Sequence, residues 1–237
     1  MKNSVTCPNC GVENPFYNTV CSDCKSYLRD RVYNLDLWSL ISSIIETPTK
    51  AFRTVIFSEH KNFIFFLLLF LSLKYLIITR FISIITIGEF QSTIGLQISY
   101  LIVLGGTIVF FLIFSPLYNL IGRSNDISLR FKDTLSLIIY TQIPLIFGLI
   151  ILFTLELVIF GDYLFSINPT PFVIKGFLAY LFFALECGTV IWSIFLLFKA
   201  FRAQSQSLSY SLTATVIFFI LLSALLYFFS HFVFTIK

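Results

Sequence analysis

Five long apolar runs occupy the chain from about residue 63 onward. Each contains the roughly 20 apolar residues that a helix needs to cross the hydrocarbon core of a bilayer. They do not show the polar/apolar alternation of strands in a membrane β-barrel. The pattern therefore predicts an all-α integral membrane bundle over residues 63–237. The expected spans are 63–87, 94–121, 134–160, 172–199 and 211–235.

In the segment 31–62, before the first span, apolar residues recur at helical spacing over shorter stretches. Apolar side chains recur at helical spacing over residues 37–45, and Thr47-Pro48 is a typical helix start. The next stretch also places its apolar residues on one face. We expect two short amphipathic helices. They either lie at the cytoplasmic membrane interface or pack on the bundle as connecting helices, and the sequence favours neither.

The first 30 residues are polar and carry two Cys-x-x-Cys pairs, made by Cys7, Cys10, Cys21 and Cys24. Four thiolates at this spacing are typical of a structural Zn²⁺ site. Gly11 allows the positive φ that the first turn needs. Two disulfides or an iron site are the alternatives. Because four cysteine sulfurs would fill all four coordination positions of a zinc ion, such an ion is expected to be structural rather than catalytic.

Composition and charge placement predict where the chain lies. It is 57% hydrophobic and 12% charged, with a net charge of +4, whereas soluble domains are about 25% charged. Basic residues concentrate in the N-terminal segment and in the second and fourth loops, which predicts a cytoplasmic N-terminus and an external C-terminus. A reducing cytoplasm also suits four free thiols. Residue usage is typical of an AT-rich bacterial genome, so we expect the bacterial inner membrane.

Ionisable side chains inside the spans are the other candidate site. Lys74, Glu156 and Glu186 fall within spans one, three and four. Because isolated charges are costly at membrane depth, Lys74 is expected to pair with Glu186 or Glu156. Such a cluster serves either as a proton or substrate path or as an ion pair that fixes helix register. Pro116 and Pro144 are expected to kink spans two and three.

No sequence motif indicates an enzyme or a nucleic-acid-binding protein. The chain contains no His-Glu-x-x-His, no Gly-x-Ser-x-Gly and no phosphate-binding glycine-rich loop. Basic residues interleaved with aromatic ones, as in many nucleic-acid interfaces, do not form a cluster either.

Two family resemblances emerge from these motifs. The segment from Cys7 to Cys24 resembles the short zinc ribbons that prefix many prokaryotic membrane proteins, although Lys25 replaces the usual glycine after the fourth cysteine and predicts a looser second turn. The rest of the chain contains the motif Tyr140-Thr141-Gln142-Ile143-Pro144 in the third span. It also contains Pro48 with Phe52, Leu120-Ile121-Gly122, Trp192 and the turn 204–211. On these motifs, of which the first is the strongest, residues 40–235 resemble the Yip1 family of five-span membrane proteins.

The Yip1 resemblance implies five helices and a cytoplasmic N-terminus. Eukaryotic members act in vesicle traffic with small GTPases, and some bacterial members accompany ABC-type exporters. We therefore expect a non-enzymatic adaptor or accessory protein of a trafficking or export assembly, in contact with the bilayer and with a membrane protein partner or further copies of itself. The alternative is a small oligomeric transporter or channel that uses Lys74, Glu156 and Glu186.

Overall fold

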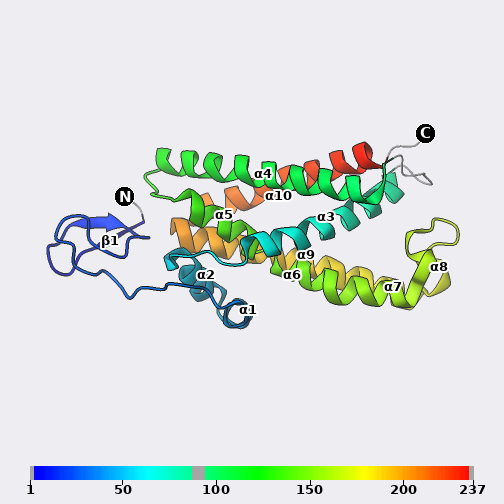
Figure 1. Ribbon diagram of the computed structural model, residues 1–237, viewed down its shortest axis with the longest axis horizontal. Helices are drawn as coiled ribbons and strands as arrows, with labels where there is room; N and C mark the ends of the chain where they lie inside the picture. The colour runs from blue at the N-terminus through cyan, green and yellow to red at the C-terminus, as the bar shows by residue number, and fades with distance from the viewer. Residues whose placement is uncertain (1–2, 87–93, 235–237) are drawn as a thin grey trace. The chain divides into compact units, whose positions relative to one another are not determined.

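A computed structural model describes residues 3–86 and 94–234 (Figure 1). It is mostly helical and contains five helices long and apolar enough to cross a membrane. A small two-stranded hairpin, β1 (Ser4–Thr6) and β2 (Glu13–Pro15), precedes them. The strands pair antiparallel with Val5 opposite Asn14. The predicted fold class, a helical membrane bundle behind a four-cysteine module, is confirmed.

Two short helices follow the hairpin, α1 (Leu37–Glu46) and α2 (Pro48–Phe57). Asp36 caps α1 by accepting a hydrogen bond from the Ser39 amide. Pro48 stands in the first turn of α2, where a missing amide hydrogen costs no helical bond. The α1 helix packs on α2, and α2 packs on the later helix α5 (Phe131–Tyr140), with Phe52 fully buried. Thus α2 takes the second of the two expected roles, a connecting helix packed on the bundle.

Four of the spans are single helices that differ modestly in extent from the expected runs. They are α3 (Ile64–Thr86), α4 (Leu96–Ser124), α9 (Gly176–Ser205) and α10 (Leu208–Val233). The expected ends of spans one and five, at residues 87 and 235, lie outside the described residues. A short helix, α8 (Pro171–Ile174), precedes α9.

The third span is built from several consecutive pieces. They are α5 (Phe131–Tyr140), α6 (Ile143–Phe147), the π-helical turn η1 (Gly148–Phe153), α7 (Thr154–Phe160) and the 3₁₀ turn η2 (Gly161–Phe165). The break falls at Thr141 and Gln142, just before Pro144 in the first turn of α6, so the expected interruption by Pro144 is confirmed. By contrast, α4 is one continuous helix that contains Pro116.

The chain forms two compact units. The first comprises Met1–Ile64, Phe111–Thr141 and Phe195–Ile217, and the second comprises Phe65–Phe110, Gln142–Ile194 and Phe218–Lys237. Tyr118 stacks on Phe201 inside the first unit, at 4.5 Å between ring centroids. Phe160, Leu164, Ala179 and Phe182 form a core cluster of the second. Most basic side chains belong to the first unit. Among the described residues, the lysines and arginines of the second unit are Lys74, Arg80 and Lys175.

Candidate metal centre and intramembrane charge cluster

Each Cys-x-x-Cys pair lies in a tight loop closed in the same way. The Cys7 amide donates to the Val12 carbonyl at 3.0 Å, and the Cys21 amide donates to the Ser26 carbonyl at 2.9 Å. The residue that follows the second cysteine of each pair has positive φ, +75° at Gly11 and +58° at Lys25. The two loops are therefore equivalent half-sites, and the φ expected at Gly11 is present.

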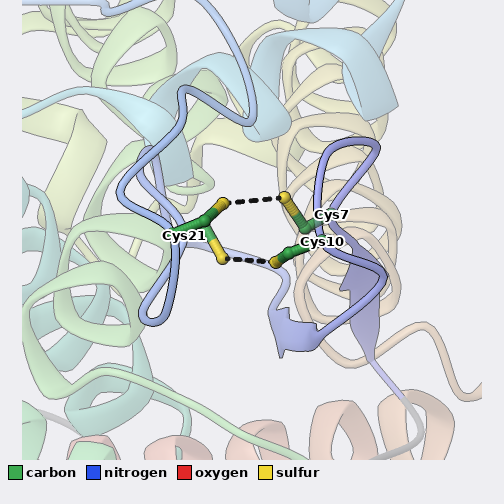
Figure 2. Close-up of side chains that lie close together, drawn as sticks. Cys7, Cys10 and Cys21 are labelled. Atoms are coloured by element: carbon green, nitrogen blue, oxygen red, sulfur yellow. Dashed lines mark hydrogen bonds between the residues drawn. The ribbon is translucent and has the colours of Figure 1, made fainter.

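The four sulfur atoms converge on one point between these loops. All four Sγ atoms lie within 4.8 Å of one another. The pairs Cys7–Cys24 and Cys10–Cys21 are each 3.6 Å apart. In Figure 2 the side chains of Cys7 and Cys10 extend from one loop toward the sulfurs of the facing loop, and Cys10 is joined to Cys21. In a tetrahedral Zn–thiolate site with bonds of about 2.3 Å, the sulfurs are about 3.8 Å apart. The cluster could therefore hold a metal ion of this kind without large movement.

Two polar residues support the sulfur cluster, and neither was identified as a site residue from the sequence. Asn14, fully buried, donates to the Val12 carbonyl at 2.9 Å and to Cys21 Sγ at 3.4 Å. Its Oδ1 accepts from the Ser22 amide at 2.8 Å, so this one side chain joins the two half-sites. The Ser26 hydroxyl lies 3.2 Å from Cys7 Sγ and 3.0 Å from Cys24 Sγ. An asparagine in a turn-rich segment gives no sequence signal for this role.

The same contacts set the protonation of the thiols. Hydrogen bonds from the Ser26 hydroxyl and amide lower the pKa of Cys24 to about 5. The Ser26 hydroxyl also lowers the pKa of Cys7. For Cys10, the Val12 amide lowers the pKa, but desolvation and the three neighbouring sulfurs together raise it to about 12. Anionic sulfur is thus favoured on both loops, as a metal-binding thiolate cluster requires.

Lys25 closes the second loop despite its unfavourable backbone conformation. Its Nζ donates to the Ser22 carbonyl at 2.9 Å on the exposed surface. This contact adds to the hydrogen bond from the Cys21 amide to the Ser26 carbonyl, which closes the second loop as its counterpart closes the first.

A Lys25→Gly variant should stabilise the hairpin by about 1 kcal/mol, because glycine adopts positive φ without the steric cost of a side chain. Slower hydrogen exchange of the Cys21 amide would report the change. Gly11→Ala is the matched opposite. An added Cβ at Gly11 meets nothing within 4 Å, so any destabilisation comes from backbone strain alone. Equal exchange rates in both variants and wild type would contradict the argument.

The hairpin is attached to the helices of the first unit through Asn3. This side chain is 1% exposed. Its Nδ2 donates to the carbonyls of Ser128 at 2.7 Å and Gln204 at 3.1 Å, and its Oδ1 accepts from the Ser128 amide at 2.8 Å. One asparagine thus ties β1 to the α4–α5 loop and to the end of α9.

Asn3→Ala should destabilise hairpin docking by about 2–3 kcal/mol, because it leaves buried backbone groups of Ser128 and Gln204 without partners. We expect faster hydrogen exchange of the Ser128 amide. Asn18→Ala removes a half-buried asparagine of the same segment and should leave that amide unchanged. An unchanged Ser128 rate in Asn3→Ala would show that the contact does not hold the hairpin.

Aromatic and cationic contacts reinforce this attachment. The Arg29 guanidinium lies 3.8 Å from the centroid of the Phe57 ring and donates to the Phe16 carbonyl at 2.5 Å. Tyr17 hydrogen-bonds Ser128 at 3.1 Å, and the Arg130 guanidinium lies 4.4 Å from the Tyr17 ring centroid. Cation–π contacts that exclude water are stronger than exposed ones. The hairpin therefore contacts α2 as well as the α4–α5 loop.

The first unit also contains a buried ion pair that the sequence did not predict. Lys61 Nζ lies 3.2 Å from Asp133 Oδ1, and both side chains are 2% exposed. Arg130 Nε donates to the other Asp133 oxygen at 2.8 Å. Lys61 also donates to the carbonyls of Val55, Ile56 and Ser58 at the end of α2. Because the last carbonyls of a helix lack intrahelical partners, this ammonium serves as the C-terminal cap of α2.

The intramembrane charges lie in the second unit. Lys74 Nζ donates to both carboxylate oxygens of Glu186 at 2.7 Å each. Of the two acids that the sequence offered as partners of Lys74, the structure therefore pairs it with Glu186. A Cβ at Gly148, the first residue of η1, would lie 3.3 Å from Glu186 Oε2 and 3.5 Å from Lys74 Nζ, so this glycine lets the backbone approach the pair. Glu156 is buried, and among the described residues no ion pair to it is present.

The chain belongs to the Yip1 family, because the Yip1 domain matches residues 42–234. The match covers α1 from Ser42, α2 and all five spans, and it leaves the four-cysteine hairpin outside. Members of this family are integral membrane proteins generally linked to membrane trafficking and generally non-enzymatic. Comparisons with curated proteins and with solved structures found no significant match.

Proposed function

We propose that this Yip1-family protein is a non-enzymatic adaptor or accessory subunit of a membrane assembly for trafficking or export, with the hairpin as its cytoplasmic contact module. The observation that carries the proposal is the attachment of the hairpin through Asn3 to Ser128 and Gln204. A module that is fixed to the loops between the spans holds a bound partner in a defined position relative to those spans. A freely tethered module would recruit the partner without fixing its position.

The proposed metal is a structural Zn²⁺ held by Cys7, Cys10, Cys21 and Cys24. Four converging thiolates satisfy the tetrahedral preference of zinc and leave no open position for a substrate. The ion would supply a cross-link between two loops that bury little apolar surface of their own. Asn14 and Ser26 orient the sulfurs for it through the hydrogen bonds described above. This closed donor set supports a docking role over a catalytic one.

The proposed topology places the N-terminus in the cytoplasm and the C-terminus outside, in a bacterial inner membrane. The hairpin, the α4–α5 loop and the end of α9 belong to one unit, which also contains most basic side chains. This concentration of basic residues supports the proposed topology. Fusions of a green fluorescent protein and of an alkaline phosphatase to each terminus test the topology. Phosphatase activity at the N-terminus would contradict it.

Affinity purification in mild detergent, with mass spectrometry of the complex, tests the adaptor role. We expect a stoichiometric membrane partner, such as a subunit of an ABC-type exporter, that is retained by wild type and by Cys187→Ser. Cys7→Ser/Cys10→Ser should lose this partner while its transmembrane helices stay folded. A homo-oligomer without any other protein would contradict the adaptor proposal and favour the second candidate.

The second candidate function is a small transporter or channel built on Lys74, Glu156 and Glu186. The specific observation in its favour is Glu156, a buried acid in the same unit as the Lys74–Glu186 pair but without an ion-pair partner among the described residues. Buried acids of this kind occur in proton and substrate paths. If this function is correct, Glu156→Gln and Glu186→Gln abolish flux in proteoliposomes, whereas Thr154→Val on the same span does not. Full flux in both glutamine variants would exclude it.

A further inference from the structure

The α1 helix has three distinct faces, and the described part of the chain covers only one of them. Leu40 and Ile44 are buried where α1 packs on α2. Ser39, Ser42 and Glu46 form an exposed polar face. Between these two faces lie Trp38, Ile41 and Ile45.

These three residues form a continuous apolar stripe, because positions three and four apart stack on one side of a helix. Trp38 is 77% exposed and Ile45 is 62% exposed, while Ile41 is half-buried. The apolar arc of α1 is therefore wider than its packing on α2 requires. A stripe of tryptophan and isoleucine side chains is unfavourable in water, so its burial would be stabilising.

The surroundings of α1 indicate what covers the stripe. Its neighbour α2 packs on α5, which begins the third span, and the chain enters the first span at Ile64 shortly after α2 ends. The α1 helix is thus attached through α2 to the helix that begins the third span, and along the chain it lies shortly before the first span. Tryptophan prefers this membrane–water boundary, where its ring is in the acyl region and its N–H stays hydrated. Lys50 and Arg53, exposed on α2, add attraction for anionic headgroups.

We propose that α1 is an interfacial helix whose Trp38–Ile41–Ile45 stripe is inserted into the headgroup–acyl boundary of the bilayer that the protein's own spans cross. The partner is thus a lipid surface. In this arrangement Leu40 and Ile44 hold α1 to α2, the stripe faces the acyl chains, and the serine-rich face remains in water. The inference is independent of the adaptor role and of the metal site.

Trp38 itself is the probe for this arrangement. The chain contains two tryptophans, Trp38 and Trp192, so Trp192→Phe isolates the signal from α1. The protein is reconstituted at one chain per nanodisc, with lipids brominated near the headgroup or with unbrominated lipids, and aqueous iodide serves as the competing quencher. If Trp192→Phe does not fold, the difference between wild type and Trp38→Phe gives the same spectrum.

We expect the brominated lipid to quench Trp38 emission about twofold and iodide to quench it weakly, as for an interfacial helix buried roughly 5–10 Å into the boundary. Ile45→Asp should reverse this order, whereas Ser42→Asp on the polar face of the same helix should leave it unchanged. Iodide quenching without lipid quenching would overturn the proposal, because the stripe would then face water or await a protein partner. Shielding from both quenchers would also overturn it, because protein would then cover the stripe.

Discussion

Asp133→Asn should be among the most destabilising single substitutions in this protein, with a loss of about 3–5 kcal/mol in the free energy of unfolding. The change leaves the Lys61 ammonium buried at 2% exposure without its carboxylate, and a buried charge deprived of its partner costs that much. Lys61 would still contact the α2 carbonyls, but these carry only partial charges. The measurement is reversible unfolding in mixed micelles, followed by helical circular dichroism.

Two further variants show whether the lost stability of Asp133→Asn comes from the unpaired buried charge. Lys132→Gln alters an exposed lysine in the same turn as Asp133 and should cost less than about 1 kcal/mol. Lys61→Met/Asp133→Leu removes both charges and should recover much of the stability lost in Asp133→Asn, because apolar replacements leave no uncompensated charge. If Asp133→Asn is as stable as Lys132→Gln, the ion pair does not hold α2 to α5.

The same variant should respond to pH in a defined direction. Burial lowers the pKa of Lys61, and in wild type Asp133 opposes that effect. Without the carboxylate, burial and the charges of Arg130 and Lys132 lower the pKa of Lys61 in the folded state below its unfolded value of 10.5. Between those two pKa values the unfolded chain binds more protons, so stability rises with pH. Asp133→Asn should therefore lose less stability, relative to wild type, at about pH 9 than at about pH 7.

Cys7→Ser/Cys10→Ser should cause the other large effect, complete loss of bound metal. Purified wild type should contain about one zinc ion per chain, and the variant none. Because zinc contributes about 10–16 kcal/mol of apparent binding free energy in small thiolate modules, the hairpin should unfold locally without it. Fast hydrogen exchange of the Ser22 amide, normally bonded to Asn14, would show this. The transmembrane helices should remain folded.

Cys187→Ser is the matched control, since this exposed cysteine lies in α9, far along the chain from the cluster. It should retain full metal content. Zinc retained by Cys7→Ser/Cys10→Ser would rule out the four-sulfur site. If wild-type protein purified under reducing conditions contains no zinc, the proposed zinc site is wrong and the two half-sites bind a different ion.

Signals that are local in sequence predicted most of this structure. Apolar runs of sufficient length predicted the five spans, and Cys-x-x-Cys spacing predicted the sulfur cluster, because both depend on residues close along the chain. The Lys61–Asp133 pair gave no such signal. Both residues lie among other charges near span ends, and only tertiary packing removes them from water. Asn3 and Asn14 were missed for the same reason, since their partners lie on other segments.

Short helices and prolines show a second limit of sequence periodicity. The spacing of residues 37–45 indicated one apolar stripe, but the structure divides it into Leu40 and Ile44 against α2 and an outward stripe with Trp38. Pro116 and Pro144 looked alike in the sequence. Only Pro144 coincides with a break, because a helix restarts there and places it in a first turn, where proline is tolerated.

The π-helical turn η1 makes the third span tolerant of the deletion of a single residue. A π turn accommodates one residue more than an α-helix of the same length. Removing one residue from 148–153 would let the hydrogen bonds return to α-helical spacing, so Glu156 and the residues around it would keep the faces that they present now. The same deletion in the uninterrupted helix α9 would rotate every following residue by about 100°. Length variation among related chains should therefore be found at η1 rather than inside the uninterrupted spans.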